Sequence, residues 1–324
     1  MVLIISEDLA RRLVSVEVAI DAVEQSFAAM AQGHARNYPV VREVLGYQDA
    51  VFGVKTGADV GAPFLGLKAG GYWPHNFNKG LTNHQSATLL FDPETGRASA
   101  LVSANYLTGV RTGAASAIAT KYLARPEAET LGIIGTGAQS AYQLKATVLV
   151  RPIARVHAWD PSPDNLTRFA QVVEDLGLDF VAEDTPEPVA RAADVLITVT
   201  PSQKALIESD WIRPGTHISA MGADTKGKQE LDPRLVARSA IFVDEAAQAI
   251  TIGECQHAFA AGLITEADIR GSLGAVITGL SRGRRNAKEI TLFDGTGVSL
   301  QDLVVAHLAK RLASERGVGV TADY

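Results

Sequence analysis

The sequence is poor in the features that would mark it as a secreted or membrane protein. Its 324 residues include one cysteine, Cys255, which excludes an intrachain disulfide and a cysteine-based metal cluster. The first residues lack the basic stretch and long apolar core of a signal peptide. No apolar run approaches the ~20 residues of a membrane helix. We therefore expect a cytoplasmic protein with no membrane partner.

The chain also lacks an excess of positive charge. It has 30 Lys and Arg residues against 36 Asp and Glu residues, a net charge of -6 at pH 7. This balance gives no basic footprint for nucleic acid, so we expect no nucleic-acid partner. A small anionic substrate would need locally placed cations, and lysines and arginines in apolar, glycine-rich segments are the candidates.

A strand that ends in a glycine turn and opens a helix occurs near the middle of the chain. Gly135 allows the tight turn, Gly137 lets the backbone approach a pyrophosphate, and the small Ser140 allows close helix–strand packing. A second strand, Arg155–Trp159, is followed directly by Asp160. Together these features favour a dinucleotide site over an ordinary strand–helix turn.

Asp160 bears on the choice of dinucleotide. Its carboxylate can accept hydrogen bonds from both ribose hydroxyls, whereas a 2′-phosphate would meet its negative charge. The sequence therefore predicts NAD(H) in preference to NADP(H). The alternative is a solvated loop acid before Pro161.

From residue 130 onward, apolar strands alternate with helices, which predicts an α/β fold with a Rossmann-type doubly wound parallel sheet. The expected helices include Ser140–Val150 and Pro163–Leu176. The expected strands are Leu131–Ile134, Val156–Trp159, Phe180–Val181, Val195–Thr198, His217–Met221 and Ala240–Val243.

The earlier residues predict an α+β domain. A helix is expected from Val16, with Ser15 as its cap and Gly33 as its end. A hairpin turn is expected at Asp92–Gly96, and a helix rich in small residues at Ala104–Leu123. The expected strands are Val2–Ile5, Val51–Val54, Phe64–Lys68, Ala87–Phe91 and Ala98–Val102.

These patterns predict two domains. Residues 1–115 would form a substrate-binding and dimerisation domain, completed by the C-terminal helix 303–324. Residues 116–302 would form the NAD-binding Rossmann domain.

Three cations are candidates for binding a substrate carboxylate. Lys68 lies in an apolar strand that runs into glycines, where it either reaches water or meets an anion. Arg111 lies among small residues, where a guanidinium could bind a carboxylate in bidentate fashion. Arg42 is a third candidate, with an exposed strand arginine as the alternative.

Asp224 follows the strand His217–Met221, at the end of a parallel strand where doubly wound folds place ligand chemistry. A carboxylate there could exchange a proton with a reacting nitrogen. The alternative is an acid that caps a turn. Lys226 and Lys228 in the same loop are candidate cofactor or substrate cations, or simply solvated charges.

Two other kinds of site have little support. His75 and His84 have no acids near them, so we expect no metal site. Together with Asn76, Asn83 and Gln85 they are instead expected to line a polar pocket wall. The candidate serines lack a Gly-x-Ser-x-Gly context, so nucleophilic hydrolysis is not indicated. These are Ser103, Ser116 and Ser299.

Several motifs occur in an order that resembles the ornithine cyclodeaminase/mu-crystallin family over nearly the whole chain. They are Gly66–Lys68, Leu90–Gly96, Thr108–Ala117, Ile134–Gln139, Gly222–Asp224 with Lys228 and Glu230, and Phe293–Asp302. The resemblance implies a homodimer that binds NAD(H) and a small anionic imino or amino acid.

The resemblance also implies roles for individual residues. Asp224 would be the acid/base residue at the imine nitrogen, with Lys68 and Arg111 as further catalytic residues. Substrate-binding residues would be Arg42, Lys68, Arg111, His84 and Lys226, the last two for a second carboxylate. Dinucleotide-binding residues would be Arg111, Thr112, Gly135, Gly137, Ala138, Gln139, Asp160, Thr200, Met221, Lys228 and Gly297.

Within the family, the chain is most similar to members that reduce an α-imino dicarboxylate with NADH. It departs from the cyclodeaminase pattern at Asn83-His84 and at Asp294-Gly295, which counts against cyclising, amine-bearing substrates. The expected activity is therefore NADH-dependent imine reduction. A cyclodeaminase, a cyclic ketimine reductase, an alanine dehydrogenase and a nucleotide-dependent binding protein remain alternatives.

Overall fold

The computed structural model describes residues 1–323, which divide into two compact units. Unit 1 consists of Met1–Arg111 together with the chain from Val298 onward, and unit 2 is Thr112–Gly297. The sequence placed the divisions a few residues later, after 115 and after 302. The last residue of the expected C-terminal segment, 324, lies outside the described residues. Substrate binding and dimerisation by the first unit stay predictions.

Unit 1 is built on one mostly antiparallel sheet. The strand order is β18-β1-β7-β6-β5-β4-β2, with β3 also paired to β4. The strands are β1 (Val2–Ile5), β2 (Ala35–Asn37), β3 (Val41–Val44), β4 (Val51–Asp59), β5 (Phe64–Tyr72), β6 (His84–Phe91), β7 (Ala98–Ser103) and β18 (Val320–Ala322). The expected turn at Asp92–Gly96 joins β6 to β7, where the Asp92 carboxylate accepts hydrogen bonds from the amides of Glu94 and Thr95.

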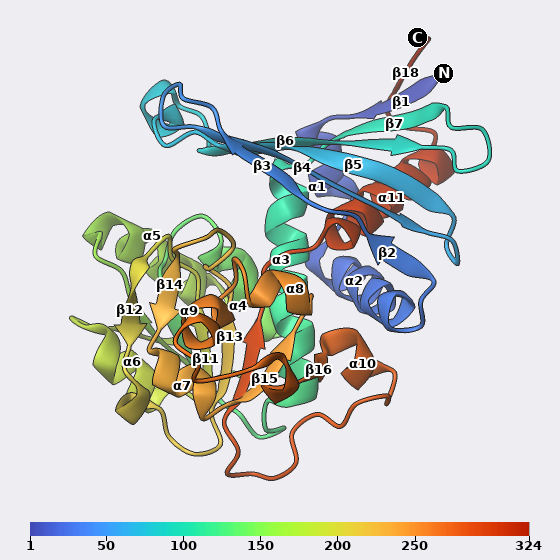
Figure 1. Cartoon of the computed structure of the whole chain (residues 1–324). Helices are drawn as coiled ribbons and strands as arrows, with labels where there is room; N and C mark the ends of the chain where they lie inside the picture. The colour runs from blue at the N-terminus through green and yellow to red at the C-terminus, as the bar shows by residue number, and fades with distance from the viewer. Residues whose placement is uncertain (324) are drawn as a thin grey trace. The chain divides into compact units, whose positions relative to one another are not determined.

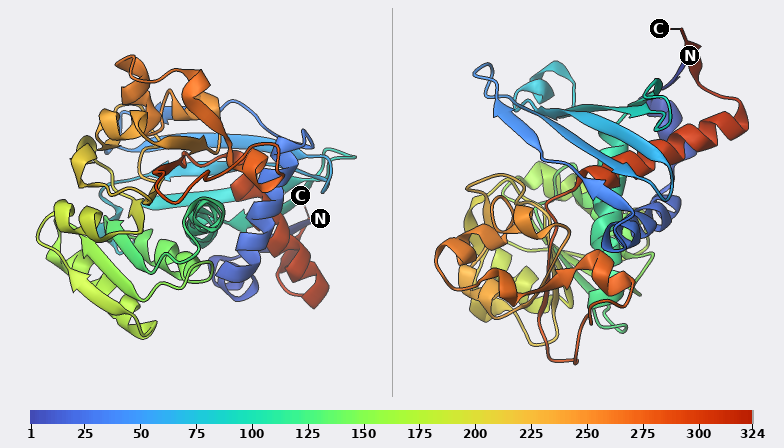
Figure 2. Two further views of the ribbon diagram at one scale, coloured as in Figure 1. Left: turned by 90° about the horizontal axis from the view of Figure 1, so that it is seen from below. Right: turned by 45° about the vertical axis from the view of Figure 1, so that its right-hand side comes forward.

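Helices cover one face of this sheet. The unit contains α1 (Glu7–Leu13), α2 (Val16–Ala31), the short η1 (Asn76–Lys79), the start of α3 (Asn105–Leu123) and α11 (Ser299–Arg316). α2 buries Ile20, Val23 and Phe27, as its apolar spacing predicts, and Gly33 follows its end with φ +76°. α11, drawn red, packs along β4, β5 and β6 (Figure 2, right).

Unit 2 contains an all-parallel sheet in the order β10-β9-β8-β11-β13-β17-β15-β16. Its strands are β8 (Thr130–Ile134), β9 (Arg155–Trp159), β10 (Asp179–Ala182), β11 (Val195–Thr198), β13 (His217–Ala220), β15 (Ala240–Val243), β16 (Ile269–Ser272) and β17 (Thr291–Asp294). The expected α/β fold with a doubly wound sheet is confirmed (Figure 1).

Helices join most of these strands. They are α4 (Ser140–Thr147), α5 (Pro163–Asp175), α6 (Pro186–Ala192), α7 (Pro233–Ala237), α8 (Ala246–Ala249), α9 (Cys255–Ala260) and α10 (Leu273–Ile277), with η2 (Ser209–Trp211) and η3 (Glu266–Asp268). A small parallel pair is formed by β12 (Gln203–Ile207) and β14 (Gln229–Leu231). α5 starts where Ser162 accepts a hydrogen bond from the Asn165 amide and Pro163 fixes the first turn. Within residues 1–323, no helix is long and apolar enough to cross a membrane.

The strand order creates a switch point in unit 2. From β8 the chain moves outward to β9 and β10, then returns to place β11 on the other side of β8. Ligands of open α/β sheets bind outside the carboxyl ends of the strands at such a point. The loops after β8 and β11 are therefore the expected place for a dinucleotide.

Candidate functional site

A buried ionic cluster lies in unit 1. Lys68 of β5 donates from Nζ to Thr108 Oγ1 at 2.7 Å and to Asp302 Oδ1 at 3.1 Å. Arg111 of α3 donates from Nε to the same Asp302 oxygen at 2.8 Å and from Nη1 to Gln301 Oε1 at 2.9 Å. The structure thus brings two predicted substrate cations to one carboxylate of α11.

Burial and charge act together on this cluster, in which Lys68 is 7% and Asp302 3% exposed. Burial lowers the pKa of Lys68 to about 7, although Asp302 acts in the opposite direction. Burial alone would raise the pKa of Asp302, but Arg111 and Lys68 outweigh it and hold that pKa well below its usual value. The carboxylate therefore stays charged, whereas Lys68 titrates near neutral pH.

His84, predicted to help bind a second carboxylate, lies at the start of β6. Burial, followed by the charge of Lys68, lowers its pKa to about 3. Its imidazole is therefore neutral at pH 7 and can serve as a hydrogen-bonding group but not as a cation.

The sheet register places further polar residues on the face that carries Lys68. Directly paired residues of an antiparallel sheet point to the same face. Lys55 of β4 pairs with Lys68 of β5. Gly53 lies two residues before Lys55 on β4, and it pairs with Gly70 of β5 on one side and with Arg42 of β3 on the other. Arg42 thus belongs to this face, on a strand that is exposed throughout.

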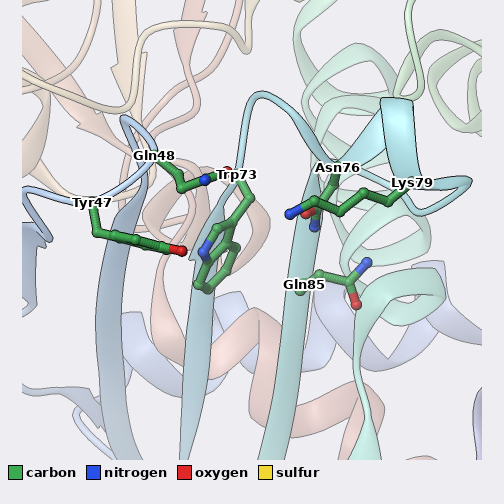
Figure 3. A pocket seen from close by; sticks show the side chains of 6 residues that line it. All are labelled: Tyr47, Gln48, Trp73, Asn76, Lys79 and Gln85. Atoms are coloured by element: carbon green, nitrogen blue, oxygen red, sulfur yellow. The ribbon is translucent and has the colours of Figure 1, made fainter.

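A small cavity lies near the loops at the ends of β3, β4, β5 and β6. Its volume is about 260 Å³, and its lining is shown in Figure 3: Tyr47, Gln48, Trp73, Asn76, Lys79 and Gln85. Of the predicted polar wall, Asn76 and Gln85 line this cavity, whereas His75, Asn83 and His84 are not among its lining residues. The expectation that no acid lies near His75 is wrong, because its Nε2 lies 3.6 Å from Asp49 Oδ2.

The glycine turn of unit 2 has the predicted geometry. Gly135 has φ +93°, and a Cβ there would lie 2.7 Å from Thr200 Cγ2 and 2.9 Å from the Val199 carbonyl. This crowding and the positive φ require glycine. A Cβ at Gly137 would meet no heavy atom within 4 Å. The turn is thus tight at the first glycine and open at the second.

Asp160 is tied to the same turn. Its Oδ2 accepts a hydrogen bond from the Thr136 amide at 2.7 Å, and its Oδ1 accepts from the Ser162 amide at 2.8 Å and the Asn165 side chain at 3.2 Å. The carboxylate therefore holds the glycine turn against the loop after β9. Since each carboxylate oxygen has two lone pairs, Oδ2 can accept one further hydrogen bond.

These features fit a dinucleotide. Gly137 and Ala138 are exposed where α4 begins, Gln139 precedes its first residue, and the first turn of α4 carries no acid. Backbone N–H groups at a helix N-terminus bind phosphate, and the absence of acid leaves their positive potential intact.

A buried glutamate connects the loops after β11 and β13. Glu230 accepts hydrogen bonds from the Thr198 hydroxyl and from the amides of Thr200 and Gly222, at 2.7, 2.6 and 2.9 Å. Burial raises the pKa of Glu230 despite these hydrogen bonds. Glu254 accepts from the amides of Glu230 and Leu231, so it holds β14 in turn.

Asp224 lies in the loop after β13, half-buried. Its Oδ1 accepts a hydrogen bond from Lys228 Nζ at 2.7 Å, and Lys228 also donates to the Gly222 carbonyl at 3.3 Å. Lys226 is exposed. The structure therefore joins the predicted acid/base residue to Lys228.

The remaining predicted dinucleotide residues are placed as follows. Thr112 is buried in α3. Met221 is also buried, and a Cβ at Gly295 would lie 2.6 Å from its Sδ. The Gly297 amide donates to Asp244 Oδ2 at 2.7 Å.

Sequence reasoning missed residues whose partners are distant in the chain. Asp302 lies 234 residues from Lys68 and Gln301 lies 190 from Arg111. Gln256 accepts a hydrogen bond from the Gly227 amide and donates to the Lys228 carbonyl, so it holds the Asp224 loop. Asp302 falls within a motif of the resemblance, which was the one available signal.

The residues that the structure describes contain no group of three or more His, Cys, Asp or Glu side chains arranged to hold a metal ion.

Asp294 is buried and accepts a hydrogen bond from the Cys255 amide at 3.0 Å. Its side chain is therefore directed into unit 2, toward the start of α9.

The sheet order and the glycine turn define a Rossmann-type α/β protein of two units. The chain belongs to the ornithine cyclodeaminase/mu-crystallin family, whose model matches residues 3–316. The resemblance seen in the sequence is thereby confirmed.

Relatives agree over nearly the full length. The iminosuccinate reductase of Paracoccus denitrificans is 51% identical over 316 residues, covering 98% of each chain. The crystal structure of the iminosuccinate reductase from that organism, in complex with NAD+, has a TM-score of 0.94 at 50% identity, covering 100% of this chain and 99% of that one.

Two more distant structures share the fold. The Δ1-pyrroline-2-carboxylate reductase of Thermococcus litoralis, in complex with NADH and L-proline, has a TM-score of 0.95 at 31% identity, covering 99% of this chain and all of that one. An archaeal alanine dehydrogenase dimer with bound NAD has a TM-score of 0.94 at 37% identity, covering 100% of this chain and 99% of that one.

Proposed function

We propose that this protein is an NADH-dependent imine reductase that converts iminosuccinate to L-aspartate. The observation that carries the proposal is the buried cationic cluster around Asp302, in a chain 51% identical to an iminosuccinate reductase. Lys68 and Arg111 share one carboxylate, so positive charge remains to be balanced. A substrate carboxylate would supply that balance.

The chain's residues would divide the work as follows. Lys68 and Arg111 would bind the α-carboxylate and fix which face of the imine is presented, with Arg42 assisting from β3. NADH, when bound, supplies the hydride for the imine carbon. Asp224 would hold or deliver the proton at the imine nitrogen, with Lys228 beside it to keep the carboxylate in place. One proton and one hydride together convert the imine to the amine.

We propose NADH in preference to NADPH because of Asp160. The free acceptor site on its Oδ2 is available to a ribose hydroxyl, and a 2′-phosphate near this carboxylate would be repelled. Gly137, Ala138 and Gln139 would receive the pyrophosphate at the start of α4. Thr112, Thr200, Met221, Lys228 and Gly297 stay proposed cofactor contacts.

We also propose that the protein is a homodimer. On β5, residues alternate between the buried helix-covered side and a side that is only half-buried, where Leu65, Leu67 and Ala69 lie. Leu101 of β7 and Phe52 of β4 share that second side and are exposed. An apolar sheet face of this kind is suited to a second copy, and an archaeal relative is described as a dimer. Light scattering of the purified chain should give twice the chain mass.

The test of function is turnover. Purified protein with oxaloacetate, ammonia and NADH should oxidise NADH and form L-aspartate in equal amounts. Asp224→Ala should lower kcat by about 100-fold or more while leaving NADH binding intact. Proline formation from ornithine with catalytic NAD+, and no turnover of the imine, would instead support a cyclodeaminase.

A further inference from the structure

We infer that Glu230 is a positioning residue for the dinucleotide, because it fixes the two loops that would bind the nicotinamide half of NADH. The inference rests on the proposed function, since it concerns the cofactor of that reaction. Three features of unit 2 carry it: the strand order, the hydrogen bonds of the Glu230 carboxylate and the close packing of the loops.

The strand order decides which loops face which half of the cofactor. Strands β9, β8, β11 and β13 lie side by side in that order. Asp160 follows β9 and is proposed to bind the adenosine ribose, and the glycine turn after β8 would receive the pyrophosphate. A dinucleotide that lies across the carboxyl ends of the strands then continues past β8 to the loops after β11 and β13. Those loops contain Thr200 and Met221, two of the proposed cofactor contacts.

Glu230, which lies on β14, ties these two loops together. Its side chain is fully buried. Oε1 accepts a hydrogen bond from the Thr200 amide at 2.6 Å, and Oε2 accepts from the Gly222 amide at 2.9 Å. Oε2 also accepts from the Thr198 hydroxyl at 2.7 Å, at the end of β11. Each carboxylate oxygen therefore holds the backbone of one loop.

A buried carboxylate is a costly way to fill space, because hydrogen bonds only partly offset its loss of solvation. An apolar side chain of similar size would fill the same volume without that cost. What Glu230 provides in addition is a pair of acceptor oxygens aimed at two loop amides. The placement of those amides is thus its specific contribution.

The loops pack closely against Glu230 and against the glycine turn. A Cβ at Gly222 would lie 2.3 Å from the Thr200 carbonyl oxygen and 2.5 Å from Glu230 Cδ. A Cβ at Gly135 would lie 2.7 Å from Thr200 Cγ2. Thr200 therefore lies against the turn on one side and is held by Glu230 on the other. A shift of its backbone would change the surface offered to the cofactor.

Glu230 itself has a firm support. Glu254 accepts hydrogen bonds from the amides of Glu230 and Leu231, at 2.9 and 2.6 Å. β14 also pairs with β12, which directly follows the loop after β11. A side chain whose own backbone is held in this way can place its partners precisely.

The experiment compares Glu230→Gln with wild-type protein. Glutamine keeps the shape of the side chain but carries one acceptor oxygen and one NH2 group. In either orientation that NH2 group faces a loop N–H, of Thr200 or of Gly222. Glu230→Gln should therefore raise the Kd for NADH by about 10- to 100-fold, measured by fluorescence titration, and raise the KM for NADH with it. The Kd for AMP, which carries only the adenosine half, should stay unchanged.

Asp194→Asn is the matched control. The Asp194 carboxylate also accepts hydrogen bonds from two backbone amides of unit 2, those of Glu129 and Thr130, both at 3.2 Å. These amides lie at the amino end of β8, away from the carboxyl ends that would face the cofactor. Asp194→Asn should lower the melting temperature and leave the Kd for NADH unchanged.

Thr198→Val is a second test variant, which keeps the shape of that side chain and removes one hydrogen bond to Glu230. It should raise the Kd for NADH by about 3- to 10-fold and again spare AMP. If Glu230→Gln does not fold, this variant decides, and an unchanged Kd for NADH would overturn the inference.

Unchanged NADH binding in a folded Glu230→Gln protein, or an equal loss of NADH and AMP binding, would also overturn it. The same loss of NADH binding in Asp194→Asn would show a general structural effect and count equally against it. A wild-type protein that binds NADH but reduces no imine would refute the proposed reaction. The NADH titrations would then still decide about Glu230.

Discussion

The Asp302→Asn substitution removes the one negative charge in the buried cluster of Lys68, Arg111 and Asp302, as far as the described residues show. Asp302 Oδ1 accepts hydrogen bonds from both Lys68 and Arg111, at 3.1 and 2.8 Å. Asparagine keeps the shape and one acceptor oxygen but leaves two buried cations without a counter-charge. Breaking a buried ion pair in this way costs about 3–5 kcal/mol. For a protein of this size, we expect the melting temperature to fall by roughly 5 °C.

The loss should depend on pH in a defined direction. The pKa of Lys68 is already lowered to about 7 by burial, and removing Asp302 should lower it further. Just below pH 7, Lys68 of the folded variant has then lost its proton, whereas the unfolded chain keeps it. The stability of the variant therefore rises with pH in that interval, while that of wild-type protein does not yet do so. The deficit in melting temperature should be larger at about pH 5.5 than at about pH 8.

Thermal unfolding of the variant at these two pH values measures both effects. The matched control is Glu315→Gln, on the same helix, whose ion pair with Arg311 at 2.8 Å is exposed. It should change stability by less than about 1 kcal/mol at either pH. An Asp302→Asn protein as stable as this control, or a deficit that grows with pH, would refute the reasoning.

Three further predictions concern other parts of the molecule. Activity on carboxylate substrates should decline above about pH 7 as Lys68 loses its proton, and a pH profile of kcat/KM that stays flat to pH 9 would contradict this. Burial raises the pKa of Asp294 to about 7, so the folded state holds a proton that the unfolded state releases, and stability should fall from about pH 4 to pH 7. Asp294→Asn should remove this fall and gain a few kcal/mol at pH 8, measured by denaturant unfolding. Gly137→Val should abolish NADH binding, measured by fluorescence titration, with an unchanged melting temperature, because nothing crowds its Cβ. Gly135→Val should instead destabilise the fold; the reverse pattern would show that the turn is misassigned.

The parts of the fold that the sequence predicted are those with strong local patterns. β8, β9 and β11 were expected because short stretches with several apolar residues are followed by glycine, acidic or polar turns and alternate with helical stretches. β17 was not expected, although it lies inside the sheet, because it contains only Thr291–Asp294 with two large apolar residues. Its place in the sheet is specified by pairing with its neighbours β13 and β15, which local spacing does not reveal.

In the candidate site too, features with a local sequence pattern were predictable and features set by distant residues were not. The glycine turn was predictable because its residues are adjacent in the chain. Asp302 and Lys55 were not, since one is joined to Lys68 across 234 residues and the other through strand register. Burial also changed the role of His84, whose lowered pKa depends on surroundings that a sequence pattern does not contain.

The central claim is that this chain reduces a dicarboxylic imine with NADH. Its most direct test is the rate of NADH oxidation with oxaloacetate and ammonia, compared with the rate for pyruvate and ammonia. We predict L-aspartate in equal amount to NADH consumed, and a higher kcat/KM for the oxaloacetate-derived imine. No aspartate, or an equal or higher kcat/KM for the pyruvate-derived imine, would contradict the account.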